Sequence, residues 1–86
     1  MVTQEEIRSA VSKGNVIIGY RESIKYLKSN TPKLVVIANN IPERMRKNLE
    51  DVSSVSGARV EVFEKDSVSL GVICGKPFPV SVLVIK

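Results

Sequence analysis

The sequence predicts a single α/β domain in which a central sheet lies between layers of helices. Two observations carry this prediction. Short apolar runs alternate along the chain with segments whose apolar residues recur at helical spacing, an order that is typical of α/β folds. Twenty-two of the 86 residues are valine or isoleucine, which favour buried strands. The length suits one domain, so we expect residues 1–86 to fold as one unit.

A capping pattern predicts the first helix. Thr3 and Glu6, three residues apart, form a capping box, which indicates that a helix begins near residue 4. Gly14 is a helix stop signal, so this helix should cover about residues 4–13. The short apolar run over residues 16–18 then predicts a strand.

A glycine and a proline limit the next two elements. The strand should end at Gly19, and a second helix is expected over about residues 21–29, with its lysines toward solvent. Pro32 interrupts the chain before an unbroken apolar run over residues 34–38. A run without alternation is typical of a strand covered on both faces, so this strand should be central.

The third helix is predicted from its start and stop signals. Asn is a strong N-cap and Pro is tolerated in the first turn of a helix. We therefore expect a helix over about residues 42–54, with Asn40 as its capping residue. Gly57 should end the turn that follows the helix.

Three shorter elements complete the chain. Residues 60–63 alternate in hydropathy, as a half-buried strand does. A short helical turn over about residues 67–72 should lead into a glycine-containing loop. The apolar run over residues 80–85 predicts the last strand.

The composition excludes several classes of function. The chain has no histidine, which excludes the usual zinc sites and histidine-based catalysis, and its single cysteine cannot form an internal disulfide. No apolar run approaches the roughly 20 residues of a membrane span. The first residues are acidic and lack the apolar core of a signal peptide. We expect a cytoplasmic protein that is not an enzyme, with no cofactor, metal or membrane partner.

Positive charge is distributed unevenly along the chain. The net charge is +4, yet residues 13–47 hold eight cations against two anions, so this stretch carries +6 and the remainder carries −2. Such asymmetry favours a basic face that suits a polyanionic partner. On charge alone, an ordinary solvated surface is an equally good interpretation.

Two glycine-containing segments are candidate binding loops. Gly19–Lys25 lies at a strand-to-helix junction, and Leu70–Phe78 precedes the last strand. Each combines glycine, a cation and a side chain able to read RNA. The second segment superficially resembles the phosphate-binding loop of nucleotide hydrolases. It has one residue too few between its glycines, Pro77 stands where Ser or Thr would bind magnesium, and a strand follows it, so this interpretation fails.

The first segment offers both phosphate and base contacts. Gly19 lets a ligand approach the backbone, and the free N–H groups of the helix that follows favour a phosphate. Lys25 lies one turn from Arg21 on the same side and adds charge. Glu22 can accept a hydrogen bond from a guanine edge or a cytosine amino group. The structural alternative is that Gly19 ends a strand and Glu22 stabilises the helix start through its charge.

The segment after the central strand offers amides and cations. Asn39 and Asn40 carry donors and acceptors suited to base edges. Because Asn40 is expected to cap the third helix, Asn39 is the freer candidate. Arg46 and Lys47 on that helix either meet phosphates or face solvent.

The second segment combines an apolar run with an aromatic ring. Val72–Cys74 either belongs to the core or forms a ledge against bases flipped out of a bulge, which RNA-binding proteins often contact. Phe78 can stack on such a base. Gly75 allows the backbone to come close, and Lys76 adds a charge.

Together these segments resemble the archaeal and eukaryotic L30e branch of large-subunit ribosomal proteins, within the L7Ae group of kink-turn RNA binders. The resemblance covers almost the whole chain, and its most specific signs are Ala38–Pro42 and Leu70–Phe78. It implies a three-layer α/β/α sandwich with a four-stranded mixed sheet. Arg21 stands where the family often has Asn, whereas Glu22 and Lys25 match the family pattern.

The resemblance implies a structural protein of the large ribosomal subunit that binds a kink-turn or internal loop of ribosomal RNA and is monomeric when free. Two alternatives stay open: a kink-turn protein of another particle, such as a guide-RNA particle or ribonuclease P, and a protein-interaction domain of the same fold without RNA. The residues expected to contact RNA are Gly19, Arg21, Glu22, Lys25, Lys28, Asn39, Asn40, Arg46, Lys47, Val72, Ile73, Cys74, Gly75, Lys76 and Phe78.

Overall fold

Four strands form one mixed sheet with the order β1-β4-β2-β3 in the computed structural model, which describes residues 3–86. Strand β4 is antiparallel to both β1 and β2, and β2 is parallel to β3. The bounds of the helices are α1 Gln4–Ser12, α2 Tyr20–Ser29, α3 Glu43–Ser56 and α4 Ser67–Ile73. The bounds of the strands are β1 Val16–Ile18, β2 Leu34–Ile37, β3 Val60–Val62 and β4 Val82–Ile85.

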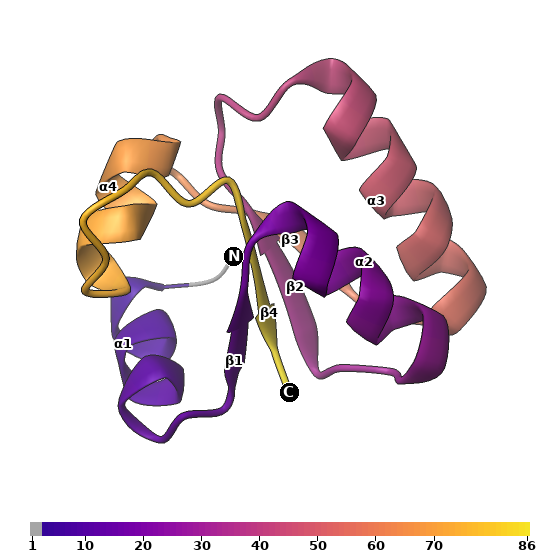
Figure 1. Cartoon of the computed structure of the whole chain (residues 1–86), viewed down its shortest axis with the longest axis horizontal. Coiled ribbons are helices and arrows are strands. Elements are labelled where there is room, and N and C mark those ends of the chain that lie inside the picture. The colour runs from indigo at the N-terminus through magenta and orange to yellow at the C-terminus, as the bar shows by residue number, and fades with distance from the viewer. Residues whose placement is uncertain (1–2) are drawn as a thin grey trace.

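The helices cover both faces of the sheet, with α1 and α4 on one side and α2 and α3 on the other (Figure 1). The predicted three-layer α/β/α sandwich with a four-stranded mixed sheet is therefore confirmed. All eight predicted elements are present, and each begins and ends within two residues of its expected bounds. The helical turn expected near residue 67 is a seven-residue helix.

Strand β2 shows why its sequence is an unbroken apolar run. Val36 belongs to a core cluster that also contains Ile7 and Leu70, from α1 and α4. Val35 and Ile37 point to the opposite face, into a cluster with Leu27 and Leu49 from α2 and α3. Because successive side chains of a strand alternate between faces, a strand covered on both sides must be apolar throughout.

Capping explains the helix starts, with one correction. The Thr3 hydroxyl oxygen accepts a hydrogen bond from the Glu6 N–H at 3.2 Å, as the capping box predicted. The expectation that Asn40 caps α3 is wrong. The capping position of α3 is Pro42, which makes no side-chain bond to the helix, and the Asn40 Oδ1 atom instead accepts from the Ser67 N–H at 2.9 Å. Asn40 thus stabilises the start of α4, a helix 27 residues away.

Candidate nucleic-acid interface

Three loops meet at one edge of the sheet. Because β1 and β2 both run antiparallel to β4, the ends of β1 and β2 lie beside the start of β4. The Gly19 N–H donates to the Val82 C=O at 3.0 Å, and the Ala38 N–H donates to the Ser81 C=O at 2.9 Å. Figure 1 shows the start of α2, the β2–α3 connection and the α4–β4 segment together at the top of the molecule.

Gly19 anchors the first of these loops. Its φ of 109° lies in the region that favours glycine. Its C=O accepts two bonds from Ser23, one from the backbone N–H at 3.0 Å and one from the hydroxyl at 2.6 Å. Arg21, Glu22 and Lys25 are all exposed beyond it. Since the first N–H groups of a helix lack intrahelical partners, this junction can bind an anion beside two cations.

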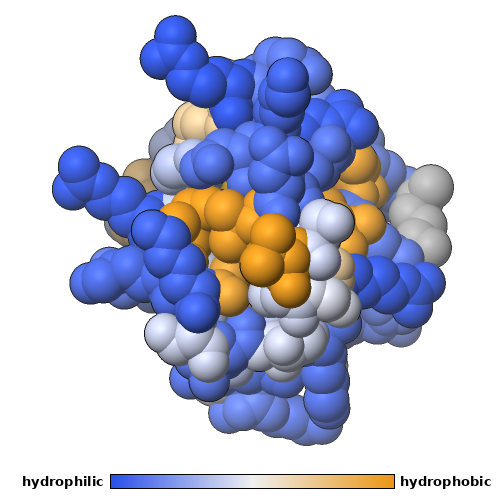
Figure 2. All heavy atoms as spheres, turned by 90° about the vertical axis from the view of Figure 1, so that its right-hand side faces the viewer, coloured by the Kyte–Doolittle hydropathy of each residue, from blue (hydrophilic) through white to orange (hydrophobic). Residues whose placement is uncertain are grey.

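Lys28 continues the same side of α2 away from the loops. Residues 21, 25 and 28 share one face of the helix by their spacing, but seven residues separate the first from the last, about 10 Å along the axis. Lys28 lies beside a hollow between α2 and α3 that is lined by Leu27 and Val55. Figure 2 shows an apolar area surrounded by polar side chains on this side of the molecule. The structure therefore places Lys28 at the outer end of a cationic stripe rather than among the loops.

Two further residues belong to this region that the sequence did not indicate. The Asn48 Nδ2 atom donates a hydrogen bond to the Tyr20 hydroxyl, which ties α3 to the first turn of α2. Both line a hollow with Arg21, Glu22 and Lys25. Asn48 is 28 residues from Tyr20 and lies inside a helix, so no local pattern could have paired them.

The two asparagines after β2 hold the loop between β3 and α4. The Asn39 Nδ2 atom donates to the Glu64 C=O at 3.0 Å, and its backbone N–H donates to the Lys65 C=O at 3.1 Å. Asn40 accepts from Ser67 as described above. Both asparagines are exposed, and these bonds leave Oδ1 of Asn39 and Nδ2 of Asn40 for another partner. Asn39 is therefore no freer than Asn40, contrary to expectation.

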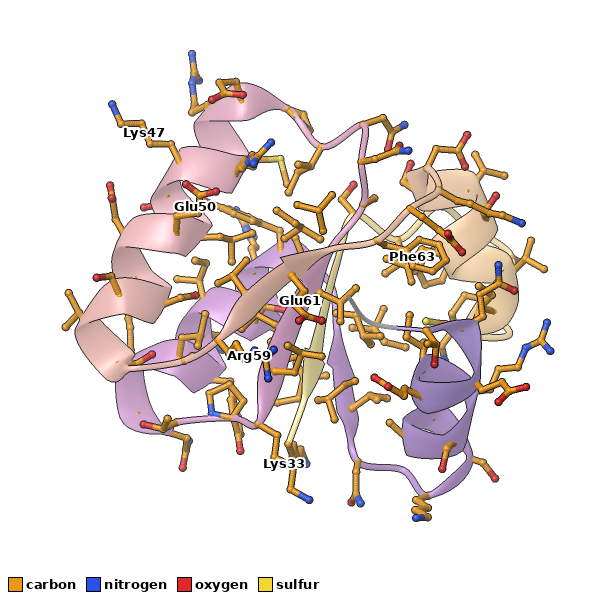
Figure 3. The ribbon with its side chains drawn as sticks, turned by 180° about the vertical axis from the view of Figure 1, so that it is seen from behind. Lys33, Lys47, Glu50, Arg59, Glu61 and Phe63 are labelled. Atoms are coloured by element: carbon orange, nitrogen blue, oxygen red, sulfur yellow. The ribbon has the colours of Figure 1, made fainter. Side chains whose placement is uncertain are left out.

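The cations of α3 differ in their surroundings. The Arg46 Nε atom lies 3.1 Å from the Glu50 Oε1 atom, and both side chains are roughly half exposed. An exposed pair of this kind contributes about 0–1 kcal/mol, so Arg46 can exchange Glu50 for a phosphate at little cost. Figure 3 shows Lys47 extending from α3 away from the rest of the chain, and it is exposed.

The α4–β4 loop is packed tightly over α4. A Cβ atom on Gly71 would lie 2.3 Å from the Phe78 carbonyl oxygen, so only glycine allows this approach. The Lys76 N–H donates to the Gly71 C=O at 2.9 Å, and the Val80 N–H donates to the Ser67 C=O at 2.9 Å. These contacts hold the loop at both ends.

The Phe78 side chain is 52% exposed at the centre of this loop. It lines a hollow of about 540 Å³ together with Gly19 and Tyr20 from the α2 junction, Met45 from α3 and Lys76 from its own loop. A ring at this place can stack on a base that enters the hollow from outside. The hollow brings together the α2 junction, α3 and the α4–β4 loop. The sequence indicated these segments one by one but not that they share a hollow.

The apolar run before this loop divides between the two interpretations that the sequence allowed, core and exposed ledge. Val72 is 70% exposed, but Cys74 is 4% exposed and belongs to the core cluster of Ile7 and Leu70, against which Ile73 is partly buried. Residues on a helix point in different directions, so three consecutive ones cannot face one ligand. Burial raises the pKa of the Cys74 thiol, and the charge of Lys76 partly offsets this effect, so the thiolate form is disfavoured.

A profile of the ribosomal protein L7Ae/L30e/S12e/Gadd45 family matches residues 1–86. The chain belongs to this family. Similar proteins include the large ribosomal subunit protein eL30 of Methanothermobacter thermautotrophicus, 46% identical over 80 residues, covering 93% of this chain and 82% of the relative. The eL30 protein of Methanosphaera stadtmanae is 42% identical over 86 residues, covering 100% and 88%. The predicted family is therefore confirmed.

Solved structures share the fold at low sequence identity. A 15.5 kD RNA-binding protein of Giardia lamblia superposes with a TM-score of 0.82 at 21% identity, covering 92% of this chain and 66% of that chain. A Bacillus halodurans protein of unknown function superposes with a TM-score of 0.84 at 20% identity, covering 93% and 79%. Both likenesses support the α/β architecture.

The comparisons also bear on catalysis. The named relatives are large-subunit ribosomal proteins, which agrees with the expectation of a protein without catalytic activity. Within residues 3–86, no group of three or more His, Cys, Asp or Glu side chains is placed to hold a metal ion. None of the helices in that range is long and apolar enough to cross a membrane.

Proposed function

We propose that this chain is a protein of the large ribosomal subunit that acts in the cytoplasm and binds a kink-turn, or a similar internal loop, of ribosomal RNA. The relatives named above are large-subunit proteins, which supports the choice of particle. The main structural support for RNA binding is that the exposed Phe78 ring lines the same hollow as the start of α2.

The residues of this surface divide into three roles. Arg21, Lys25 and Lys76 contact phosphates, and they supply the salt-dependent part of the affinity. Glu22 and the two asparagines after β2 reach base edges with their remaining donors and acceptors. Phe78 stacks on a base that the internal loop extrudes, as RNA readers commonly do with unstacked bases.

A titration of a generic kink-turn RNA tests the proposal. The matched control RNA has the same length and composition, but its G·A pairs are replaced so that the kink cannot form. We expect tight binding to the kink-turn alone, with an affinity that falls as salt rises. Equal binding to both RNAs would mean that the surface is a basic patch without specificity for the kink-turn. Failure to bind either would favour the alternative of a protein-interaction domain.

The role of Phe78 is tested by substitution. Base stacking contributes about 1–3 kcal/mol per base, so Phe78→Ala should weaken kink-turn binding by roughly 5- to 150-fold. Because the ring is half exposed, the unfolding midpoint should change little. Phe78→Tyr keeps a ring and serves as the matched control, with near-normal affinity. A large loss of stability in Phe78→Ala with unchanged affinity would place the ring in the core instead.

We further propose that the free protein is a monomer. Its exposed large apolar side chains within the described part of the chain belong to four different segments, α3, β3, α4 and the α4–β4 loop. Polar side chains surround the apolar area of Figure 2. Light scattering during gel filtration measures the mass directly, and a dimeric mass would contradict this proposal.

A further inference from the structure

Basic residues also line the end of the sheet opposite the three loops. Strands β1, β2 and β3 begin at this end, and β4 finishes there. Arg59 directly precedes β3, Lys33 directly precedes β2 and Lys86 directly follows β4. Lys13 ends α1 and is joined to β1 by only two residues. These four residues, in the order Lys13, Lys86, Lys33 and Arg59, follow the strand order β1-β4-β2-β3 and are called the basic row here.

Backbone hydrogen bonds hold the basic row together. The Lys86 N–H donates to the Asn15 C=O at 2.9 Å, and the Lys33 N–H donates to the Ile85 C=O at 3.0 Å. The Arg59 C=O accepts from the Val35 N–H at 2.8 Å. All four basic side chains are exposed. Since neighbouring strands lie about 4.8 Å apart, the row spans roughly 15 Å at its backbone.

The nearby acidic groups do not neutralise the row. The Arg59 Nη2 atom, just before β3, lies 3.2 Å from the Oε1 atom of Glu61 in β3. Figure 3 shows Arg59 and Lys33 at the same end of the sheet. Glu5 and Glu6 share a hollow with Lys13, Lys33 and Lys86. They lie in the first turn of α1, however, about two turns of helix from Lys13. Three lysines therefore line this hollow with two glutamates, so its lining side chains have a net positive charge.

The row also lacks the large exposed apolar side chains on which protein recognition depends. The large apolar side chains exposed in residues 3–86 are Val55, Val62, Val68, Val72 and Phe78, and none belongs to the row or its hollow. Protein interfaces depend on desolvated aromatic or apolar anchors, whereas contacts to a nucleic-acid backbone need only positioned cations. The chemistry of the row therefore favours phosphates.

We propose that the basic row is a second RNA contact surface, which binds the phosphate backbone without reading its sequence. The protein then holds two RNA segments, one at each end of its sheet. This surface is separate from the three loops, so it does not depend on the recognition of a kink-turn.

A plain RNA duplex of about 16 base pairs, without an internal loop, is the probe for this surface. Addition of the duplex to the full ¹⁵N-labelled chain should shift the backbone amide signals of the row and of the residues hydrogen-bonded to it. The double variant Lys13→Gln/Lys33→Gln removes two contacts, so the log–log salt slope should fall by about 1.4–1.8 units. At 0.15 M salt this corresponds to a loss of roughly 10- to 30-fold in affinity for the duplex.

The double variant Arg8→Gln/Arg44→Gln is the matched control. It removes the same charge from two exposed residues, on α1 and α3, that belong neither to the row nor to the residues assigned to the candidate interface. We expect the control to bind the duplex within about threefold of the unsubstituted protein, since charges more than about 8 Å away are screened at this salt. Thermal unfolding of both variants checks that neither has lost its fold.

The same titration on protein saturated with kink-turn RNA separates the two surfaces. The row signals should still shift, because the first RNA occupies the other end. Shifts confined to the Gly19 and Phe78 loops, or an equal loss in both double variants, would overturn the proposal. So would shifts of the row with a poly-glutamate peptide but not with the duplex. If the kink-turn RNA does not bind at all, the proposed function is wrong. The duplex titration on the free protein still tests the basic row in that case.

Discussion

Replacing Gly71 with alanine tests how the α4–β4 loop is held over α4. The new Cβ atom would lie 2.3 Å from the Phe78 carbonyl oxygen, 3.2 Å from the Phe78 carbonyl carbon and 3.4 Å from the Pro79 Cα atom. Real Cβ atoms essentially never come closer than 3.0 Å to such an oxygen, so the loop must move by at least the difference from 2.3 Å, which is 0.7 Å. The obstructing atoms are backbone, so no side-chain rotation can relieve the contact.

The cost of this movement can be set against the gain from alanine. Overpacking of a well-packed site costs about 1–3 kcal/mol, and here prolines on both sides of Phe78 reduce the freedom of the loop to adapt. Alanine in place of glycine within a helix contributes about 1 kcal/mol in the opposite direction. Because the loop adapts poorly, we expect a cost in the upper part of that range, about 2–3 kcal/mol. The net loss is then roughly 1–2 kcal/mol, which lowers the melting temperature by about 4–16 °C in a domain of this size.

The assay combines thermal unfolding with the kink-turn titration. A displaced loop carries Phe78 with it, so Gly71→Ala should also weaken RNA binding several-fold. Val68→Ala is the control, because Val68 is an exposed residue of the same helix and should change stability by no more than about 0.5 kcal/mol. An unchanged or raised melting temperature for Gly71→Ala, together with normal RNA affinity, would refute the tight packing of the loop on α4.

Two further predictions concern hydrogen bonds that position the interface. Asn48→Ala and Tyr20→Phe each remove the bond between α3 and α2, so each should cost about 0.5–1.5 kcal/mol, and the double variant should cost little more than either alone in urea unfolding. Fully additive losses would mean that the two side chains do not interact. Hydrogen bonds from Ser69, chiefly from its backbone N–H, lower the pKa of Asp66 below the ordinary value of 3.8. The ionised carboxylate therefore stabilises the fold above pH 3.8, and this contribution is lost as the pH falls through the lowered pKa. Asp66→Ala should therefore melt lower than the unsubstituted protein at pH 6 and approach it at pH 2, and a difference that is constant with pH would contradict the capping role.

Local signals explain why the elements could be predicted. The capping box at Thr3, the glycines at helix ends and the apolar run of β2 each act within a few residues of where they occur. Strand order follows from contacts between distant segments, and the sequence did not predict it, because the family resemblance implied only a four-stranded mixed sheet. The same distinction explains the error at Asn40, since a strong N-cap residue near a proline predicted α3 while the actual partner, Ser67, lies 27 residues away.

The sequence predicted many residues of the candidate interface, but it did not predict how they are arranged in space. Exposure of Arg21 and Lys25 agrees with the sequence, because charged residues rarely enter a core. Exposure of Phe78 agrees with its expected place in a binding loop. The burial of Cys74 could not be read from the chain, since it depends on how α4 rotates against α1. The basic row was equally invisible, because its members are scattered along the sequence and meet only through the strand order.

The loops of the interface are already held in place before RNA binds. Asn39 and Asn40 hold the β3–α4 segment, Gly71 lets the following loop pack onto α4, and Gly19 is bonded to both Ser23 and β4. Ordering a loop on binding costs free energy that subtracts from affinity, so a loop already held in place retains more of its contact energy. Loosening a support such as the Asn40–Ser67 bond should therefore weaken RNA binding. Asn40→Ala removes both this bond and Nδ2, the atom proposed to reach the base. Ser67→Pro removes the N–H that makes the bond and leaves Nδ2 of Asn40 in place. Comparable losses in these two variants would show that support of the loop, and not the direct contact alone, determines the affinity.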